Sequence, residues 1–145
     1  MISNVTPADF DRLFEIEQTA HLVPWSKGTL LNNQGEAYVN LKLTVEDRTV
    51  AFAICHCVLD EATLFNIAVD PKFQGKGYGK RLLTELILQL QQTNIQTLWL
   101  EVRESNLTAQ KLYESLGFNQ VTIRKNYYPT PDGKRENAVV MALYI

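Results

Sequence analysis

The sequence has few of the features that mark membrane, secreted or nucleic-acid-binding proteins. No apolar run approaches the roughly 18 residues that a membrane-spanning helix needs. The segment from Met1 to Pro7 has neither the charged nor the apolar region of a secretory signal. Fourteen basic and 16 acidic residues give a formal net charge of −2, without a basic block. We therefore expect a cytoplasmic monomer or weak dimer that binds no membrane and contacts no nucleic acid directly.

Cysteine is also scarce, which argues against a disulfide framework or a structural metal. The only two, Cys55 and Cys57, flank His56 inside an apolar run that is typical of a buried strand. A Cys-His-Cys metal clip is an alternative, but no second ligand cluster completes a tetrahedral set. We expect reduced, packed thiols and no metal.

The chain of 145 residues, 46% of them hydrophobic, is long enough to close one core. We predict a single domain over residues 1–145. Apolar periodicity and caps predict four helices: one from Pro7 to about Ala20, a short one after Ser26, one from the glycine-rich loop to about Gln92, and one from about Ala109 to Leu116. Alternating and β-branched runs predict six strands: Val39 to Glu46, Val50 to Leu59, Thr63 to Val69, Thr97 to Val102, Gln120 to Asn126 and Ala138 to Tyr144. Short links between strands favour antiparallel neighbours, so the fold class is α/β (α+β) with a mixed, mostly antiparallel sheet.

The segment from Gln74 to Lys80 places three glycines between a strand and the start of the helix with the clearest apolar stripe. Free backbone N–H groups and the positive end of a helix dipole at such a point can hold a phosphate. The glycine spacing is not that of a Rossmann fingerprint, and Arg81 stands where a P-loop needs Ser or Thr. A flexible turn without a ligand is the alternative that the glycines alone leave open.

These glycines lie in a longer pattern. Gln74-x-x-Gly77-x-Gly79 resembles the pyrophosphate loop of the GNAT acetyltransferase superfamily. Other segments resemble its RimI branch, the bacterial alanine N-acetyltransferases of the small ribosomal subunit. They are Pro24-Trp25-Ser26, Asp60 to Phe65, Asn66 to Pro71, Leu98 to Arg103, Asn106, Leu112 to Phe118 and Asn126 to Pro129. The resemblance covers nearly the whole chain.

The resemblance implies the GNAT fold, a central sheet of about six to seven strands flanked by about four helices, and acetyl-coenzyme A as cosubstrate. In that fold two strands splay apart, and the pantetheine arm pairs with the exposed backbone. The implied coenzyme contacts are the backbone of Ile67, Ala68 and Val69, the loop residues Gln74, Gly75, Lys76, Gly77, Tyr78, Gly79 and Lys80, and the side-chain amide of Asn106.

Acetyl transfer to an amine needs two proton-handling groups, because the ammonium must lose a proton and the departing thiolate must gain one. The resemblance assigns the general base to Glu101 and the general acid to Tyr113. From spacing alone, Tyr113 fits the apolar stripe of its helix, and Glu101 fits a solvated charge or a partner of Arg103. The resemblance favours the catalytic roles.

The acceptor that the resemblance implies is a protein N-terminus, specifically the N-terminal alanine of the eighteenth protein of the small ribosomal subunit. We expect its basic tail to lie between the loop near Trp25 and the Tyr127-Tyr128 segment, near acidic residues such as Glu15, Glu17 or Glu36. His21 is expected to be a surface or capping residue. An acetyltransferase for a free small amine, or a non-catalytic coenzyme A sensor, are the alternatives.

Overall fold

The computed structural model describes the whole chain, Met1 to Ile145. In chain order the elements are β1 (Ile2–Asn4), a 3-10 turn (Pro7–Asp9), α1 (Phe10–Ala20), α2 (Lys27–Asn32), β2 (Tyr38–Val45), β3 (Arg48–Val58), β4 (Glu61–Val69), a 3-10 turn (Pro71–Phe73), α3 (Tyr78–Gln91), β5 (Thr97–Arg103), α4 (Leu107–Ser115), β6 (Asn119–Pro129) and β7 (Arg135–Tyr144). No helix is both long and apolar enough to cross a membrane.

The strands form one seven-stranded sheet in the order β1-β2-β3-β4-β5-β7-β6. All neighbours are antiparallel except β4 and β5, which run parallel. The α3 crossover between β4 and β5 permits this parallel pair, since parallel strands need a long connection. The mixed, mostly antiparallel sheet with four helices confirms the predicted fold class.

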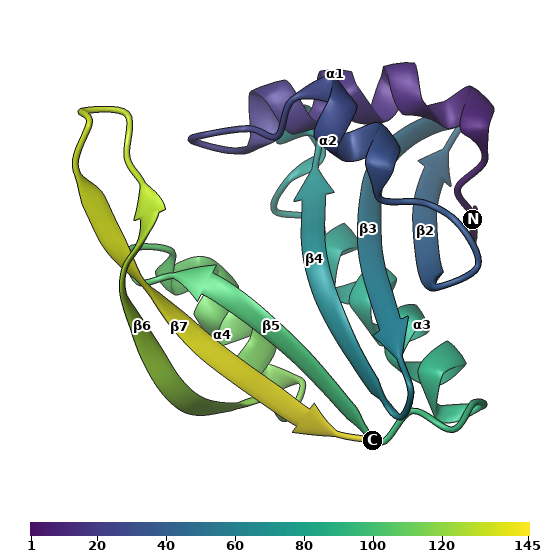
Figure 1. The fold of residues 1–145 in the computed structure, drawn as a ribbon. Coiled ribbons are helices and arrows are strands. Elements are labelled where there is room, and N and C mark those ends of the chain that lie inside the picture. The colour runs from purple at the N-terminus through teal and green to yellow at the C-terminus, as the bar shows by residue number, and fades with distance from the viewer.

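The parallel pair is joined along only part of its length. Glu61 to Leu64 of β4 pairs with Thr97 to Leu100 of β5, and the two strands then separate. Figure 1 shows the result, in which β2 to β4 and β5 to β7 spread apart like the arms of a V. The splayed strand pair expected from the sequence is therefore present.

Helices cover the two faces of the sheet and close two core clusters. The larger cluster contains the apolar stripe of α3, whose buried members are Leu82, Leu83, Leu86 and Leu90. The smaller one packs Phe10, Leu13 and Ile16 of α1 against Phe52 and Ile54 of β3. Each fully buried leucine contributes about 1.5–3 kcal/mol, so these stripes hold the arm of β2 to β4 between α1 and α3.

Two parts of the fold differ from the sequence prediction. The three-residue β1, which pairs with β2, was not predicted, because so short a strand carries no measurable alternation. The final hairpin is longer than expected on both strands: β6 runs to Pro129 and β7 starts at Arg135. Its pairing is interrupted between Arg124 and Tyr128, where Asn126 adopts a left-handed φ of 52°. The predicted end of the strand at Asn126 therefore coincides with this irregularity and not with the end of β6.

Candidate active site

A cleft of about 1090 Å³ lies where β4 and β5 separate. Its walls come from the connection between α1 and α2, the diverging parts of β4 and β5, the glycine-rich loop, α4 and the end of β6. This volume matches the upper end of pockets that hold small molecules and cofactors. Segments far apart in the chain therefore share one cavity. From the sequence, only the resemblance to a known family indicated that these segments meet.

The glycine-rich loop forms one end of the cleft. Gly75 and Gly77 adopt left-handed φ angles of 77° and 79°, and a Cβ on either would meet no atom within 4 Å. Gly77 is the N-cap of α3 and has no capping side chain, so the first N–H groups of this helix remain available to a ligand. The side-chain amide of Gln74 donates to the carbonyl of Val69 at 3.0 Å and ties the loop to β4. Open space, free donors and a helix dipole fit the pyrophosphate of a coenzyme.

Most of the predicted coenzyme contacts meet in this cleft. The residues that line it are Ile67, Ala68, Val69, Gln74, Gly75, Gly77, Tyr78, Gly79, Lys80 and Asn106. Lys76 is the exception, since it is not a lining residue, and its ammonium group lies 5.5 Å from the ring centre of Phe73. Asn106 caps α4 by accepting a hydrogen bond from the Ala109 N–H at 3.1 Å, which leaves its NH₂ group for a ligand.

Glu101 lies on β5 next to the point where the strands part. The strand alternates as expected, with Leu98, Leu100 and Val102 buried and Glu101 on the other face. One carboxylate oxygen, Oε2, is buried without any hydrogen-bond partner, and Oε1 lies 3.5 Å from Nε of Arg124. A buried carboxylate oxygen without a donor is costly and rare. Glu101 lines the cleft, and its Oε2 has an acceptor position that no group of the chain fills.

Tyr113 lies on α4 and both packs in the core and lines the cleft. It is 5% exposed and contacts Phe118, with ring centres 5.7 Å apart. Burial raises the pKa of its phenol to about 12, since the phenolate would lose its hydration. The hydroxyl is therefore protonated near neutral pH and is able to donate.

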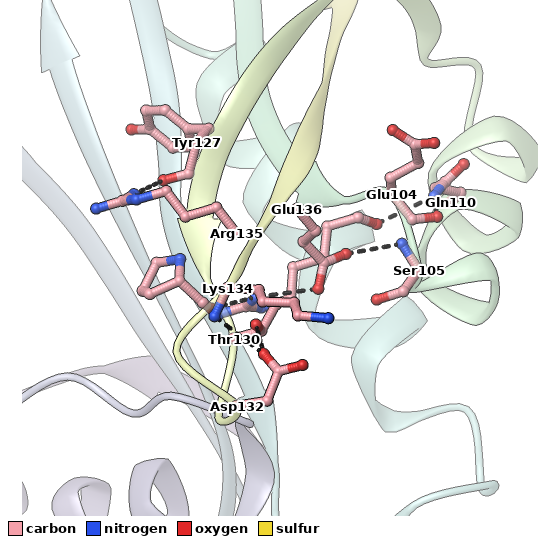
Figure 2. A network of polar contacts seen from close by, with 11 residues as sticks. Glu104, Ser105, Gln110, Tyr127, Thr130, Asp132, Lys134, Arg135 and Glu136 are labelled. Atoms are coloured by element: carbon pink, nitrogen blue, oxygen red, sulfur yellow. Dashed lines mark hydrogen bonds and ion pairs between the residues drawn. The ribbon is translucent and has the colours of Figure 1, made fainter.

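The β6–β7 hairpin is fastened to the loop that follows β5. Glu136 accepts from the Ser105 N–H at 3.0 Å and from Nη1 of Arg103 at 3.2 Å, as Figure 2 shows for the Ser105 contact. Arg103 also donates to the Pro129 carbonyl at 2.8 Å and stacks 4.7 Å from the ring centre of Tyr128. Burial would raise the pKa of Glu136, but the hydrogen bonds from Ser105 and Arg103 hold it below its usual value. This clamp holds Tyr128 at the wall of the cleft.

Only some of the residues predicted to surround the tail of the acceptor protein lie in the cleft. Trp25 and Tyr128 line the cleft, as does Glu17. Tyr127 is 42% exposed and is not among the lining residues, and neither are Glu15 and Glu36. Those two glutamates lie on solvent-facing parts of the chain.

The sequence predicted His21 to be a surface or capping residue, and it is the C-cap of α1 with a side chain that is 36% exposed. It also lies in the wall of the cleft, which the sequence did not indicate. Asn66, whose side chain bonds to His21, was noted only as part of the resemblance. No spacing signal could have joined the two, because they are 45 positions apart in the chain. Their meeting depends on how α1 packs over β4.

The cysteine pair lies away from the site, on β3. Both thiols are free, and His56 stacks on Phe65 with ring centres 5.3 Å apart. No group of three or more His, Cys, Asp or Glu side chains gathers in a way that could hold a metal ion.

Known proteins resemble this chain along its full length. Residues 5–118 match the model of the family described as "Acetyltransferase (GNAT) family". The "[Ribosomal protein bS18]-alanine N-acetyltransferase" of Haemophilus ducreyi is 71% identical over 145 residues and the two sequences cover each other completely. The crystal structure of the ribosomal-protein-S18-alanine N-acetyltransferase from Escherichia coli has a TM-score of 0.96 at 56% identity, covering 100% of this chain and 93% of that one. The structure of Arabidopsis thaliana NAA60 in complex with acetyl-CoA, at 16% identity, shares the fold with a TM-score of 0.89, covering 100% and 98% of the two chains.

Proposed function

Since the chain belongs to the GNAT acetyltransferase family and is therefore an acyltransferase, we propose that it acetylates the N-terminal alanine of ribosomal protein bS18. The observation that carries the chemistry is the unpartnered carboxylate oxygen of Glu101 beside the split between β4 and β5. The choice of acceptor is supported by the relative that is 71% identical over the full length and is named for this activity.

Acetyl-coenzyme A supplies the acetyl group as a thioester with a thiolate leaving group. The chain holds it with the N–H groups from Gly75 to Lys80 at the pyrophosphate and with the NH₂ group of Asn106. Beyond Leu64, β4 has no partner on its β5 side, so backbone groups of Ile67 to Val69 are free to pair with the pantetheine amides. One of these N–H groups would also polarise the thioester carbonyl.

Glu101 acts as general base, directly or through a water. Its carboxylate accepts a proton from the substrate's α-ammonium, which leaves a nitrogen lone pair for attack on the thioester carbonyl. Tyr113 acts as general acid from α4, which packs on the face of β5 opposite Glu101. Its protonated phenol donates to the departing sulfur, and the acetyl group passes to the amine without a covalent enzyme intermediate.

If the glycine-rich loop binds the pyrophosphate, Gly77→Ala should affect both stability and coenzyme affinity. A residue with a Cβ in the left-handed region loses about 1–2 kcal/mol relative to glycine, so the free energy of unfolding should fall by that amount. Affinity for coenzyme A should also fall, because the loop relaxes away from its open conformation. Urea unfolding and calorimetric titration with coenzyme A measure the two effects.

Gly28→Ala is the matched control for this variant. Gly28 lies in α2 without a positive φ, and its Cβ would meet only Ser26 Oγ at 3.9 Å. This control should keep both stability and coenzyme affinity. A Gly77→Ala protein with unchanged affinity would contradict the role given to the loop.

The acceptor is tested by comparing rates of coenzyme A thiol release with three substrates. These are a basic peptide that starts with alanine, the same peptide with a blocked N-terminus and an internal lysine, and spermidine as a free small amine. We expect rapid release with the first peptide alone. Turnover on spermidine instead would favour an acetyltransferase of small amines, and coenzyme binding without turnover on any amine would indicate a sensor.

A further inference from the structure

His21 closes α1 and points its ring toward β4. It is the C-cap residue of the helix, with extended backbone angles of −117° and 147°. Its Nε2 lies 2.9 Å from Oδ1 of Asn66, and its side chain is 36% exposed and lines the cleft. The ring therefore has one edge bound to the protein and another available to a ligand.

Asn66 is itself held by a buried carboxylate. Its Nδ2 donates to Oε1 of Glu17 at 2.8 Å, and the Trp25 N–H donates to Oε2 at 2.9 Å. Glu17 is 1% exposed, and both of its oxygens serve as acceptors. Because the NH₂ group of Asn66 must face Glu17, its carbonyl oxygen must face His21.

This order of bonds determines which ring nitrogen of His21 carries a proton. A carbonyl oxygen only accepts, so Nε2 of His21 donates to Asn66. In the neutral ring, Nδ1 is then an unprotonated acceptor, and no hydrogen bond within the protein involves it. Burying the polar side chains of Glu17 and Asn66 costs free energy unless all their polar atoms are hydrogen-bonded. The series of hydrogen bonds from Glu17 through Asn66 to His21 leaves Nδ1 of His21 as an acceptor in the cleft wall.

The acceptor nitrogen belongs to the end of the cleft opposite the coenzyme loop. The neighbouring wall residues from the α1–α2 connection are Val23, Pro24 and Trp25. They lie on the α1 face of β4, whereas the glycine-rich loop leads into α3 on the other face. A substrate that reaches the split from this side passes the His21 ring.

We propose that His21 binds the acceptor peptide directly, with its Nδ1 accepting a hydrogen bond from the α-ammonium group of the first residue. This inference rests on the proposed function, because it requires a peptide N-terminus on this side of the cleft. The Glu17-Asn66 pair sets the tautomer, and Glu101 remains the group that removes the proton.

Two amide variants separate the contact with the peptide from the structural hydrogen bond between His21 and Asn66. His21→Gln places its amide near the Nε2 position and keeps a donor for Asn66, but removes the acceptor at Nδ1. His21→Asn places a carbonyl oxygen near the Nδ1 position and loses the bond to Asn66. Initial-rate kinetics with an alanine-starting basic peptide give KM and kcat for each. Titration of the peptide onto protein saturated with coenzyme A gives an affinity without turnover.

We expect His21→Gln to raise the peptide KM and Kd by about 5- to 10-fold, the effect of one lost hydrogen bond. The KM for acetyl-coenzyme A should stay within about twofold, and His21→Asn should lie closer to wild type in peptide affinity. The proposal would be overturned if His21→Gln left peptide affinity unchanged, or if His21→Asn lost as much peptide affinity as His21→Gln. Failure of the proposed function would look different, since wild-type protein would then neither bind nor acetylate the peptide.

Discussion

Glu101→Gln should lower kcat/KM for the alanine-starting peptide by about 10²- to 10⁴-fold, the usual contribution of a positioned general base. Glutamine keeps the shape of the side chain but cannot take the proton from the ammonium. Since Oε2 has no partner to lose and Arg124 is 56% exposed, thermal stability should hardly change. Steady-state kinetics and thermal unfolding of the same preparation measure both.

Glu104→Gln is the control for this loss. Glu104 follows directly after β5, and its exposed carboxylate makes no hydrogen bond or ion pair, so activity should remain at the wild-type level. An equal loss in both variants, or no loss in Glu101→Gln, would contradict the assignment of the base.

Tyr113→Phe should lower kcat by about 10²-fold with little change in either KM. The ring keeps its packing against Phe118, and only the proton donor is removed. Because the pKa of Tyr113 is raised to about 12, the wild-type phenol stays protonated at every pH where the protein is usually assayed. The variant should therefore be slower by the same factor across the neutral and mildly alkaline range, measured as a pH profile of kcat.

Tyr144→Phe provides the comparison, because Tyr144 is 86% exposed at the end of β7 and should tolerate the change. The leaving thiolate also offers a direct probe. An acyl donor with a more acidic thiol needs less protonation, so it should restore part of the lost rate in Tyr113→Phe. No restoration would indicate that the hydroxyl serves packing or binding instead.

Local sequence patterns predicted the individual helices and strands, whose residues are close together in the sequence. The stripe of α3 and the alternation of β5 each follow from a single period, and both matched the structure to within one or two residues. The glycine-rich loop was predicted to lead into the helix that follows it, and Gly77 is the N-cap of α3. The role of this loop as a phosphate site stays a prediction.

Other features depend on pairings that no local pattern contains. The separation of β4 from β5 beyond Leu64 came only through the resemblance, since a strand's sequence does not state where its neighbour departs. The clamp between Arg103 and Glu136 joins positions 33 apart, and the sequence suggested Arg103 only as a partner of Glu101. The capping position of His21 was predicted, but its place in the cleft was missed for the same reason, because its partner Asn66 lies on a different element.

Tandem mass spectrometry of ribosomal protein bS18, incubated with acetyl-coenzyme A and this chain, tests the central claim most directly. The account predicts one acetyl group, located on the α-amine of the N-terminal alanine with wild-type protein and nearly absent with Glu101→Gln. Acetyl groups on lysine side chains, or an unmodified bS18 beside active turnover of a free amine, would contradict it.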